Sequence, residues 1–323
     1  MDVVQTLANK VLAGDKLTRQ EAEKLYQQPL ASLCRTADEL RRHFCGDGFD
    51  LCSIVNAKSG RCSENCRFCA QSAWYPTQIA VYPLRETEEL VAEAKRQEAQ
   101  GMLRYSIVTA GKRVTGEELD QICRAAERIL QETSLSVCAS VGLLGEADYR
   151  KLRQAGVDRV HNNLETSRQH FPHICTTHTF ADKCAAIRAA QAAGLSVCSG
   201  GILGMGETAE DRIDLAFTLD ELGVDSVPVN LLNGIPGTPL ADQPRLAEEE
   251  LRRTVAVWRF LLPRVTIRLA GGRGLLADKG EGCFRAGANG AISGDMLTTA
   301  GISGATDRQL LAGLGYEVRR DHD

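Results

Sequence analysis

One unit recurs along the sequence from about residue 100 onward, and it limits the fold more than any other feature. In each copy a helical stretch ends just before a glycine, and a short run rich in β-branched residues follows. Glycine just past a helix end is a common C-cap, because it adopts the left-handed conformation without a Cβ clash. These glycines are Gly101, Gly156, Gly194, Gly223 and Gly287. The strands after them are expected at 105–108, 157–160, 195–198, 224–227 and 290–292.

Three further short strands are expected at 53–55, 136–138 and 265–267, which brings the total to about eight strand-then-helix units. Helical stretches between them carry apolar stripes, of which Leu251, Val255, Trp258 and Leu262 form the clearest. This alternation predicts an α/β fold in which a parallel sheet closes into a (β/α)8 TIM-type barrel. Right-handed crossovers then place the functional loops at the carboxyl ends of the strands.

Residues 1–45 are predicted to form an N-terminal helical extension, in which Thr18 and Glu21 make a capping box at a helix start. Residues 46–303 are predicted to form the barrel. Residues 304–323 are polar, and we expect a C-terminal tail there, with a short helix and a frayed end. The absence of a linker rich in Pro, Gly or Ser favours one catalytic domain with helical additions.

Charge and hydropathy argue against two classes of partner. The 38 Lys and Arg residues against 42 Asp and Glu residues give a net charge of −4, unlike a typical nucleic-acid binder. No run approaches the roughly 18 apolar residues of a membrane span, and the first residues do not resemble a signal peptide. We therefore expect a cytoplasmic protein, whose 12 cysteines serve metal binding or catalysis rather than disulfides.

The strongest local signal is a C-x3-C-x2-C motif formed by Cys62, Cys66 and Cys69, directly after the first expected strand. Three thiolates at this spacing can hold three irons of a four-iron four-sulfur (4Fe-4S) cluster and leave the fourth iron open. An open metal position suits a reaction, whereas a structural site is closed by four protein ligands. Structural zinc and disulfides are the alternatives, but no second C-x2-C or H-x3-H pair accompanies the motif.

This motif, with the aromatic Phe68 before its last cysteine, resembles the radical S-adenosyl-L-methionine (AdoMet) superfamily. The resemblance implies that the open iron chelates AdoMet, and that one electron cleaves AdoMet to a 5′-deoxyadenosyl radical. Within the superfamily, residues 35 to 300 are similar to the biotin synthase family. The most similar stretches are 158–167, 197–208, 226–232, 237–240, 267–273 and 286–289.

Similarity to the biotin synthase family implies a sulfurtransferase that inserts sulfur between C6 and C9 of dethiobiotin, the last step of biotin biosynthesis. It also implies an auxiliary iron–sulfur cluster (2Fe-2S or a variant), held by three cysteines and one arginine. Cys138, Cys198 and Arg268 match three of these positions; the two cysteines fall on expected strands, and Arg268 lies at the end of the strand expected at 265–267. Ser106 occupies the remaining position, and a hydroxyl is a poor substitute for a soft thiolate on iron. Our hypothesis is that Cys175 takes over ligation or that the cluster differs in composition; Cys175 as a small buried residue is the alternative.

The same resemblance implies that Phe68, Asn163, Glu165 and Ile202 bind AdoMet. Asn163 and Asn230 would also hold the ureido ring of the substrate, since an Asn amide both donates and accepts hydrogen bonds. Two features depart from the family, which usually has Asp at the position of Glu165 and the reverse order at His161-Asn162. A flavodoxin or ferredoxin as electron donor and a homodimer are further implications.

Two other signals are set aside. Residues 204–209 fit a G-x-G-x-x-A dinucleotide pattern, but they lie on the fifth unit, whose strand carries Cys198. Six cysteines have no ligand-like spacing and are expected to be small buried residues: Cys34, Cys45, Cys52, Cys123, Cys184 and Cys283. The rival functions are another radical AdoMet barrel enzyme, similar to a hydrogenase maturase or methylornithine synthase, and a non-catalytic iron–sulfur or zinc protein.

Overall fold

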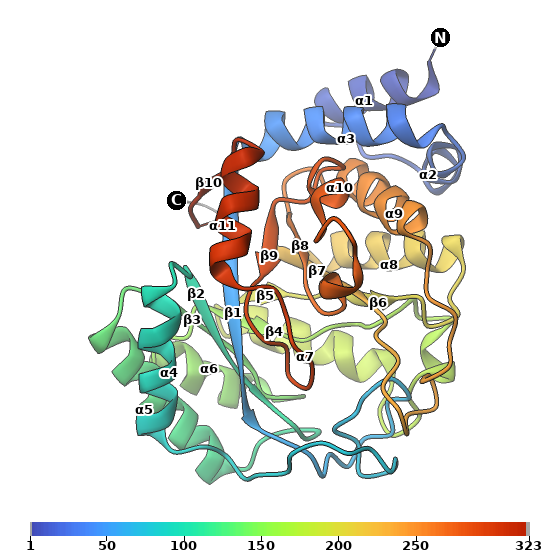
Figure 1. Ribbon diagram of the computed structural model, residues 1–323. Coiled ribbons are helices and arrows are strands. Elements are labelled where there is room, and N and C mark those ends of the chain that lie inside the picture. Colours follow the sequence, from blue (N-terminus) through green and yellow to red (C-terminus); the bar gives the residue numbers. More distant parts are fainter. Residues whose placement is uncertain (1, 321–323) are drawn as a thin grey trace.

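The recurring strand-and-helix units close into a parallel barrel in the computed structural model, which describes residues 2–320 (Figure 1). Each strand pairs in parallel with its neighbour, and β1 pairs with β9 to close the ring. β5 and the short β6 follow each other and share one position in the ring, so the predicted (β/α)8 TIM-type barrel is confirmed. The ring consists of β1 (Gly48–Lys58), β2 (Arg104–Thr109), β3 (Ser136–Ser140), β4 (Arg159–His161), β5 (Ser196–Cys198), β6 (Gly201–Leu203), β7 (Ser226–Leu231), β8 (Thr266–Leu269) and β9 (Gly290–Ile292).

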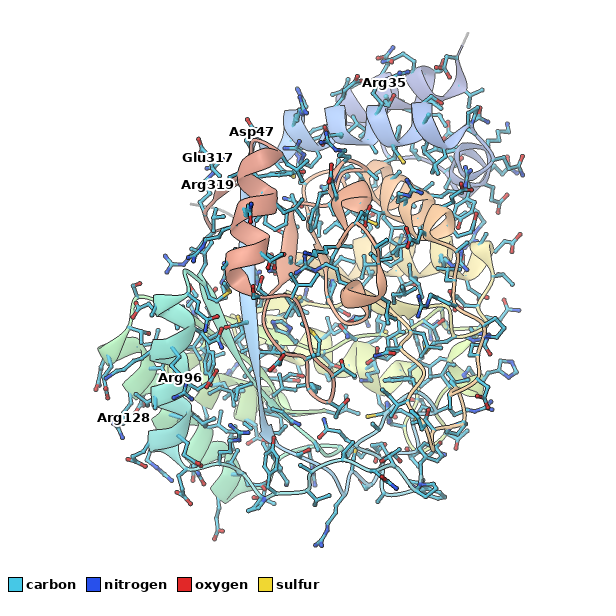
Figure 2. The ribbon with its side chains drawn as sticks, in the orientation of Figure 1. Arg35, Asp47, Arg96, Arg128, Glu317 and Arg319 are labelled. Carbon is cyan, nitrogen blue, oxygen red and sulfur yellow. The ribbon has the colours of Figure 1, made fainter. Side chains whose placement is uncertain are left out.

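Helices surround the ring, and the glycines that follow these helices have the backbone conformation that was predicted. Gly101, Gly156, Gly194, Gly223 and Gly287 all have positive φ, which confirms their role at helix ends. Charged side chains such as Arg96 on α4 and Arg128 on α5 project outward (Figure 2). The helices are α4 (Thr87–Ala99), α5 (Gly116–Glu132), α6 (Glu146–Gln154), α7 (Phe180–Ala192), α8 (Ala209–Leu222), α9 (Glu248–Leu261), α10 (Glu281–Phe284) and the 3₁₀ turns η1 (Phe171–His173) and η2 (Arg273–Leu275). Within residues 2–320, none of the helices has both the length and the apolar character needed to traverse a bilayer.

The N-terminal segment is helical, as predicted. It forms α1 (Val3–Leu12), α2 (Arg19–Tyr26) and α3 (Leu30–Cys45), and the Thr18–Glu21 capping box is present at the start of α2. α3 packs along α9. Figure 1 shows these helices at one end of the barrel and the loop after β1 at the other.

The C-terminal segment is more ordered than we expected. The short helix is present as α11 (Gly304–Gly313), but β10 (Glu317–Val318) follows it and pairs in parallel with Gly48 and Phe49. An aromatic contact explains this order, because the ring centroid of Tyr316 lies 5.0 Å from that of Phe49. Figure 2 shows Asp47, Glu317 and Arg319 together at this edge. The boundaries of the extension and the tail remain predictions.

The inside of the barrel is layered, because alternate residues of each strand face the axis. The lowest layer, which we call the charged floor, consists of Asp50, Arg104 and Arg268. Asp50 lies 2.8 Å from Arg104 and 2.7 Å from Arg268, and all three side chains are buried. Burial alone would raise the pKa of Asp50, but the two guanidiniums outweigh it and hold that pKa well below its usual range. This layer lies toward the end of the barrel where the strands begin, since Asp50 is near the start of β1 and Arg104 is the first residue of β2.

Candidate active site

The three cysteines of the motif lie on the loop after β1, at the carboxyl end of the barrel, where sequence reasoning placed them. The backbone of Cys62 is fixed by pairing with a later part of the same loop, since its N–H donates to Gln71 O (2.9 Å) and its carbonyl accepts from Ala73 N (2.8 Å). The N–H of Cys69 donates to the carbonyl of Cys66 at 3.0 Å. All three thiols are half-buried and free of disulfides. Soft, reduced thiols gathered on one loop suit an iron–sulfur cluster.

A cavity opens beside this loop, at the carboxyl ends of the strands. Most of the residues predicted to bind AdoMet or substrate line it, although they come from four separate segments of the chain. The predicted residues on its wall are Phe68, Cys69, Asn163, Ile202 and Asn230. The loop arrangement of a parallel barrel explains this convergence, because all the strands end at the same rim.

One wall of the cavity is apolar. Phe68 and Ile202 pack against a small cluster of buried side chains that includes Met205 and Leu232. Such a wall can bury the face of an aromatic base. It therefore agrees with the expectation that Phe68 and Ile202 bind AdoMet, which remains a prediction.

Asn163 and Glu165 follow β4 at the edge of the cavity. The Asn163 side chain accepts from Gly200 N at 3.3 Å. Glu165 has a φ of 70°, and its backbone is held on both sides by hydrogen bonds to Gly200 (3.0 Å) and Ile202 (2.9 Å). Burial raises the pKa of Glu165, and its Oε2 has no hydrogen-bond partner among residues 2–320. A buried acceptor on a strained backbone is typical of a site that expects a ligand donor, such as a ribose hydroxyl.

Asn230, near the end of β7, is oriented by two backbone contacts. Its Nδ2 donates to Gly201 O at 3.1 Å, and its Oδ1 accepts from Gly271 N at 2.9 Å. These contacts link the start of β6 to the segment that follows β8. The side-chain amide therefore faces the cavity in one fixed orientation, as a ureido-binding group requires.

The glycine-rich loop after β6 is built around a carboxylate, not around a phosphate. Glu207 accepts from Gly204 N (2.8 Å) and Met205 N (2.7 Å), and it pairs with the buried Arg212 at 2.9 Å. These backbone amides are thus already occupied by an acidic side chain. The geometry supports setting the dinucleotide pattern aside.

Cys175 lies beside the motif and not among the buried cysteines of the strands. Its Sγ, that of Cys66 and a ring nitrogen of His178 all lie within 4.8 Å of one another. Hydrogen bonds from Cys66 and His178 lower the pKa of the Cys175 thiol to about 3. Asn65 explains the placement, because its Oδ1 accepts from Thr176 N (2.9 Å) and fastens this segment to the motif loop. The structure therefore does not support Cys175 as the missing auxiliary ligand.

Inside the barrel, the structure brings the predicted strand residues together. Cys138 and Cys198 are fully buried. Arg268 lies near enough to Cys198 for its positive charge to favour the thiolate form. Cys138 lies in the middle of β3, since that strand continues to Ser140, and not at its end as we expected. Ser106 is the register partner of Cys138 on β2, and its hydroxyl has no hydrogen-bond partner within the described chain.

Sequence reasoning missed Cys52. Its thiol is buried, as expected, but it lies in the barrel interior, close enough to the Cys138 thiol to interact with it. The strand expected at 53–55 begins at Gly48 in the structure. Ile54 lines the cavity, and Cys52, two residues earlier on the same strand, lies on the same inner face.

Both family models and individual known proteins match this chain. Residues 57–219 match the Radical SAM superfamily, and residues 228–317 match the Biotin and Thiamin Synthesis associated domain. "Biotin synthase" of Brachyspira hyodysenteriae is 52% identical over 317 residues, which are 98% of this chain and 95% of that protein. "Biotin synthase 2" of Corynebacterium diphtheriae is 54% identical over 323 residues, which are 100% of this chain and 98% of that protein.

Solved structures confirm the fold. A methylornithine synthase superposes with a TM-score of 0.84 at 21% identity, covering 98% of each chain. A maturase of the [FeFe]-hydrogenase superposes with the same TM-score of 0.84 at 17% identity, covering 97% of this chain and 74% of the other. At these identities the likeness concerns the fold alone, whereas the sequence relatives extend over nearly the full chain. The chain belongs to the biotin synthase family of radical AdoMet enzymes.

Proposed function

We propose that this protein is a biotin synthase, a sulfurtransferase that joins C6 and C9 of dethiobiotin through sulfur. The observation that carries the proposal is the position of the cavity. The motif loop with Cys69 forms one side of it, Asn163 and Asn230 face into it, and the buried thiols of Cys138 and Cys198 lie in the barrel beneath it. A substrate bound there would lie between two groups of cysteines with different surroundings.

The donors on the motif loop fit the 4Fe-4S cluster that the superfamily implies. Cys62, Cys66 and Cys69 would hold it, because they are reduced, partly accessible and fixed by the loop backbone. When bound, the cluster supplies the electron that cleaves AdoMet. Phe68 and Ile202 would bury the adenine in their apolar wall.

The polar residues of the cavity would position substrate and cofactor. Glu165 would accept from the ribose hydroxyls with its unpartnered Oε2. Asn163 and Asn230 would bind the ureido ring, whose N–H and C=O groups complement two amides. Their fixed orientations hold the two target carbons of dethiobiotin in one place, which favours reaction at those carbons over others.

Further parts of the proposal concern the setting. An auxiliary iron–sulfur cluster would be held in the barrel interior by Cys138, Cys198 and Arg268, whose soft thiols and absence of solvent suit it. A flavodoxin or ferredoxin would supply electrons, and the enzyme would act as a homodimer. The free thiols of the described chain support a reducing compartment such as the cytoplasm.

The test is anaerobic reconstitution with iron and sulfide, followed by AdoMet, dethiobiotin and a low-potential reductant. We expect both 5′-deoxyadenosine and biotin, and we expect neither from Cys69→Ala. Cys123→Ala, which changes a half-buried thiol on α5, serves as the matched control with full activity. Formation of 5′-deoxyadenosine without biotin would favour another radical AdoMet enzyme, and absence of both products would favour a non-catalytic metal protein.

A further inference from the structure

The barrel interior holds one more thiol than the sequence comparison assigned to it. Cys52 on β1 is 1% exposed and Cys138 is 0% exposed, and the two thiols lie close enough to interact with each other. Cys198 is 0% exposed as well and lies near enough to Cys138 to interact electrostatically with it. Three thiols that the sequence separates widely therefore meet in one buried place.

Ser106, the residue that the thiol of Cys52 would replace as a ligand, is a small residue beside this group of thiols. β2 lies between β1 and β3, and Ser106 is the residue of β2 that sits beside Cys138 in register. Its side chain is small and fully buried, and its Oγ has no hydrogen-bond partner within residues 2–320. On its other side, Ser106 is in register with Ile54 of β1, two residues after Cys52.

β1 also orients the arginine of this place. Asp50, two residues before Cys52 on the same face of the strand, contacts Arg268 at 2.7 Å, and its carbonyl accepts from Arg268 Nη1 at 3.0 Å. The guanidinium acts electrostatically on both Cys52 and Cys198. The side chains of β1, β3, β5 and β8 thus converge on the same part of the barrel.

We propose that Cys52 provides the third thiolate of the auxiliary iron–sulfur site, in place of the hydroxyl of Ser106. The ligand set is then Cys52, Cys138, Cys198 and Arg268. Thiolate sulfur matches iron far better than a serine hydroxyl does, so moving the ligand from β2 to β1 keeps three soft donors in the site. This inference rests on the proposed function, because it assumes that an auxiliary cluster is present.

The test uses a background in which the motif loop cannot hold iron, made by changing Cys62, Cys66 and Cys69 to Ala. After anaerobic reconstitution, iron and sulfide per chain, visible absorbance and Mössbauer spectra then report on the auxiliary site alone. We expect this protein to bind iron, and we expect Cys52→Ala in the same background to remove that iron. The added Ser106→Ala change should leave iron content and spectra as they were.

The outcomes separate the two proposals. If the triple variant binds no iron at all, the auxiliary cluster itself is refuted, and the inference with it. If it binds iron that Cys52→Ala does not remove, only the assignment of Cys52 is refuted. Cys123→Ala is the matched cysteine control, and far-ultraviolet circular dichroism of the apo forms checks folding. Should Cys52→Ala not fold, Cys52→Ser, which keeps the size of the side chain, takes its place: loss of iron or a changed Mössbauer spectrum there, with no change in Ser106→Ala, upholds the inference, and an unchanged spectrum overturns it.

Discussion

Glu207 organises the loop that carries the apolar wall of the cavity, and its removal should be costly. Its carboxylate accepts from Gly204 N at 2.8 Å, Met205 N at 2.7 Å and Arg212 Nε at 2.9 Å. The Glu207 side chain is 2% exposed and that of Arg212 is 7% exposed. In Glu207→Ala, two buried N–H groups lose their acceptor, and the buried guanidinium of Arg212 loses the nearer of its two carboxylate partners.

The size of the effect follows from these contacts. A buried donor left without a partner costs about 1–3 kcal/mol, and breaking a buried ion pair costs about 3–5 kcal/mol. Arg212 keeps contacts with Tyr26 (2.9 Å) and Glu250 (3.2 Å), which moderates the loss. We therefore expect Glu207→Ala to lower the free energy of unfolding by about 4 kcal/mol. Urea unfolding of the apo protein, followed by circular dichroism, measures it.

A functional consequence should accompany the loss of stability. Met205 packs with Phe68 and Ile202, so a loosened loop weakens the expected adenine site. AdoMet should bind about tenfold more weakly, which equals about 1.4 kcal/mol. Glu210→Ala, an exposed carboxylate in the first turn of α8, is the control and should stay within about 1 kcal/mol of wild type. A change below about 1 kcal/mol for Glu207→Ala would refute the reasoning.

Three further predictions follow from single contacts. Gly272→Ala should prevent stable folding, seen as loss of soluble protein, because Gly272 has a φ of 80° and an added Cβ would lie 2.0 Å from a backbone carbonyl oxygen. The control is Gly313→Ala, at the end of α11, which should be tolerated because the space around it is open. Asn230→Ala should raise the KM for dethiobiotin about tenfold and leave AdoMet binding unchanged in equilibrium dialysis, whereas an equal effect on both would assign Asn230 a purely structural role. Glu21 has its pKa lowered from 4.5 to about 2, first by its hydrogen bond from Lys10, so its contribution to stability is complete above pH 4.5 and is lost as the pH falls toward 2. Glu21→Gln should therefore flatten the acid limb of a stability-against-pH curve, and an unchanged slope would contradict this.

Much of the fold was predictable because the signals were local. Glycines such as Gly156 and Gly223 mark helix ends by a conformation that other residues rarely adopt, and the structure shows positive φ at each. The capping box at Thr18 is likewise a contact between residues three apart. The position of the cysteine motif followed from the rule that parallel barrels carry their chemistry at the carboxyl ends of strands.

The remaining features depend on contacts between distant segments, which spacing alone does not reveal. Cys175 lies beside Cys66 because Asn65 fastens the two loops together, although more than a hundred residues separate them. Cys52 appeared isolated because the length of β1 could not be read from its short β-branched run. β10 forms because the ring of Tyr316 packs against that of Phe49, a contact between residues far apart in the sequence.

The charged floor bears on how the proposed auxiliary site could be reloaded. Asp50, Arg104 and Arg268 are 2%, 4% and 1% exposed, so buried charges lie between the deep thiols and the end of the barrel where the strands begin. If the proposed auxiliary cluster gives up its sulfur, replacement iron and sulfide would reach Cys138 and Cys198 from the other end, through the cavity lined by Asn163 and Asn230. Substrate in that cavity would block the same route, so reloading and substrate binding would have to alternate.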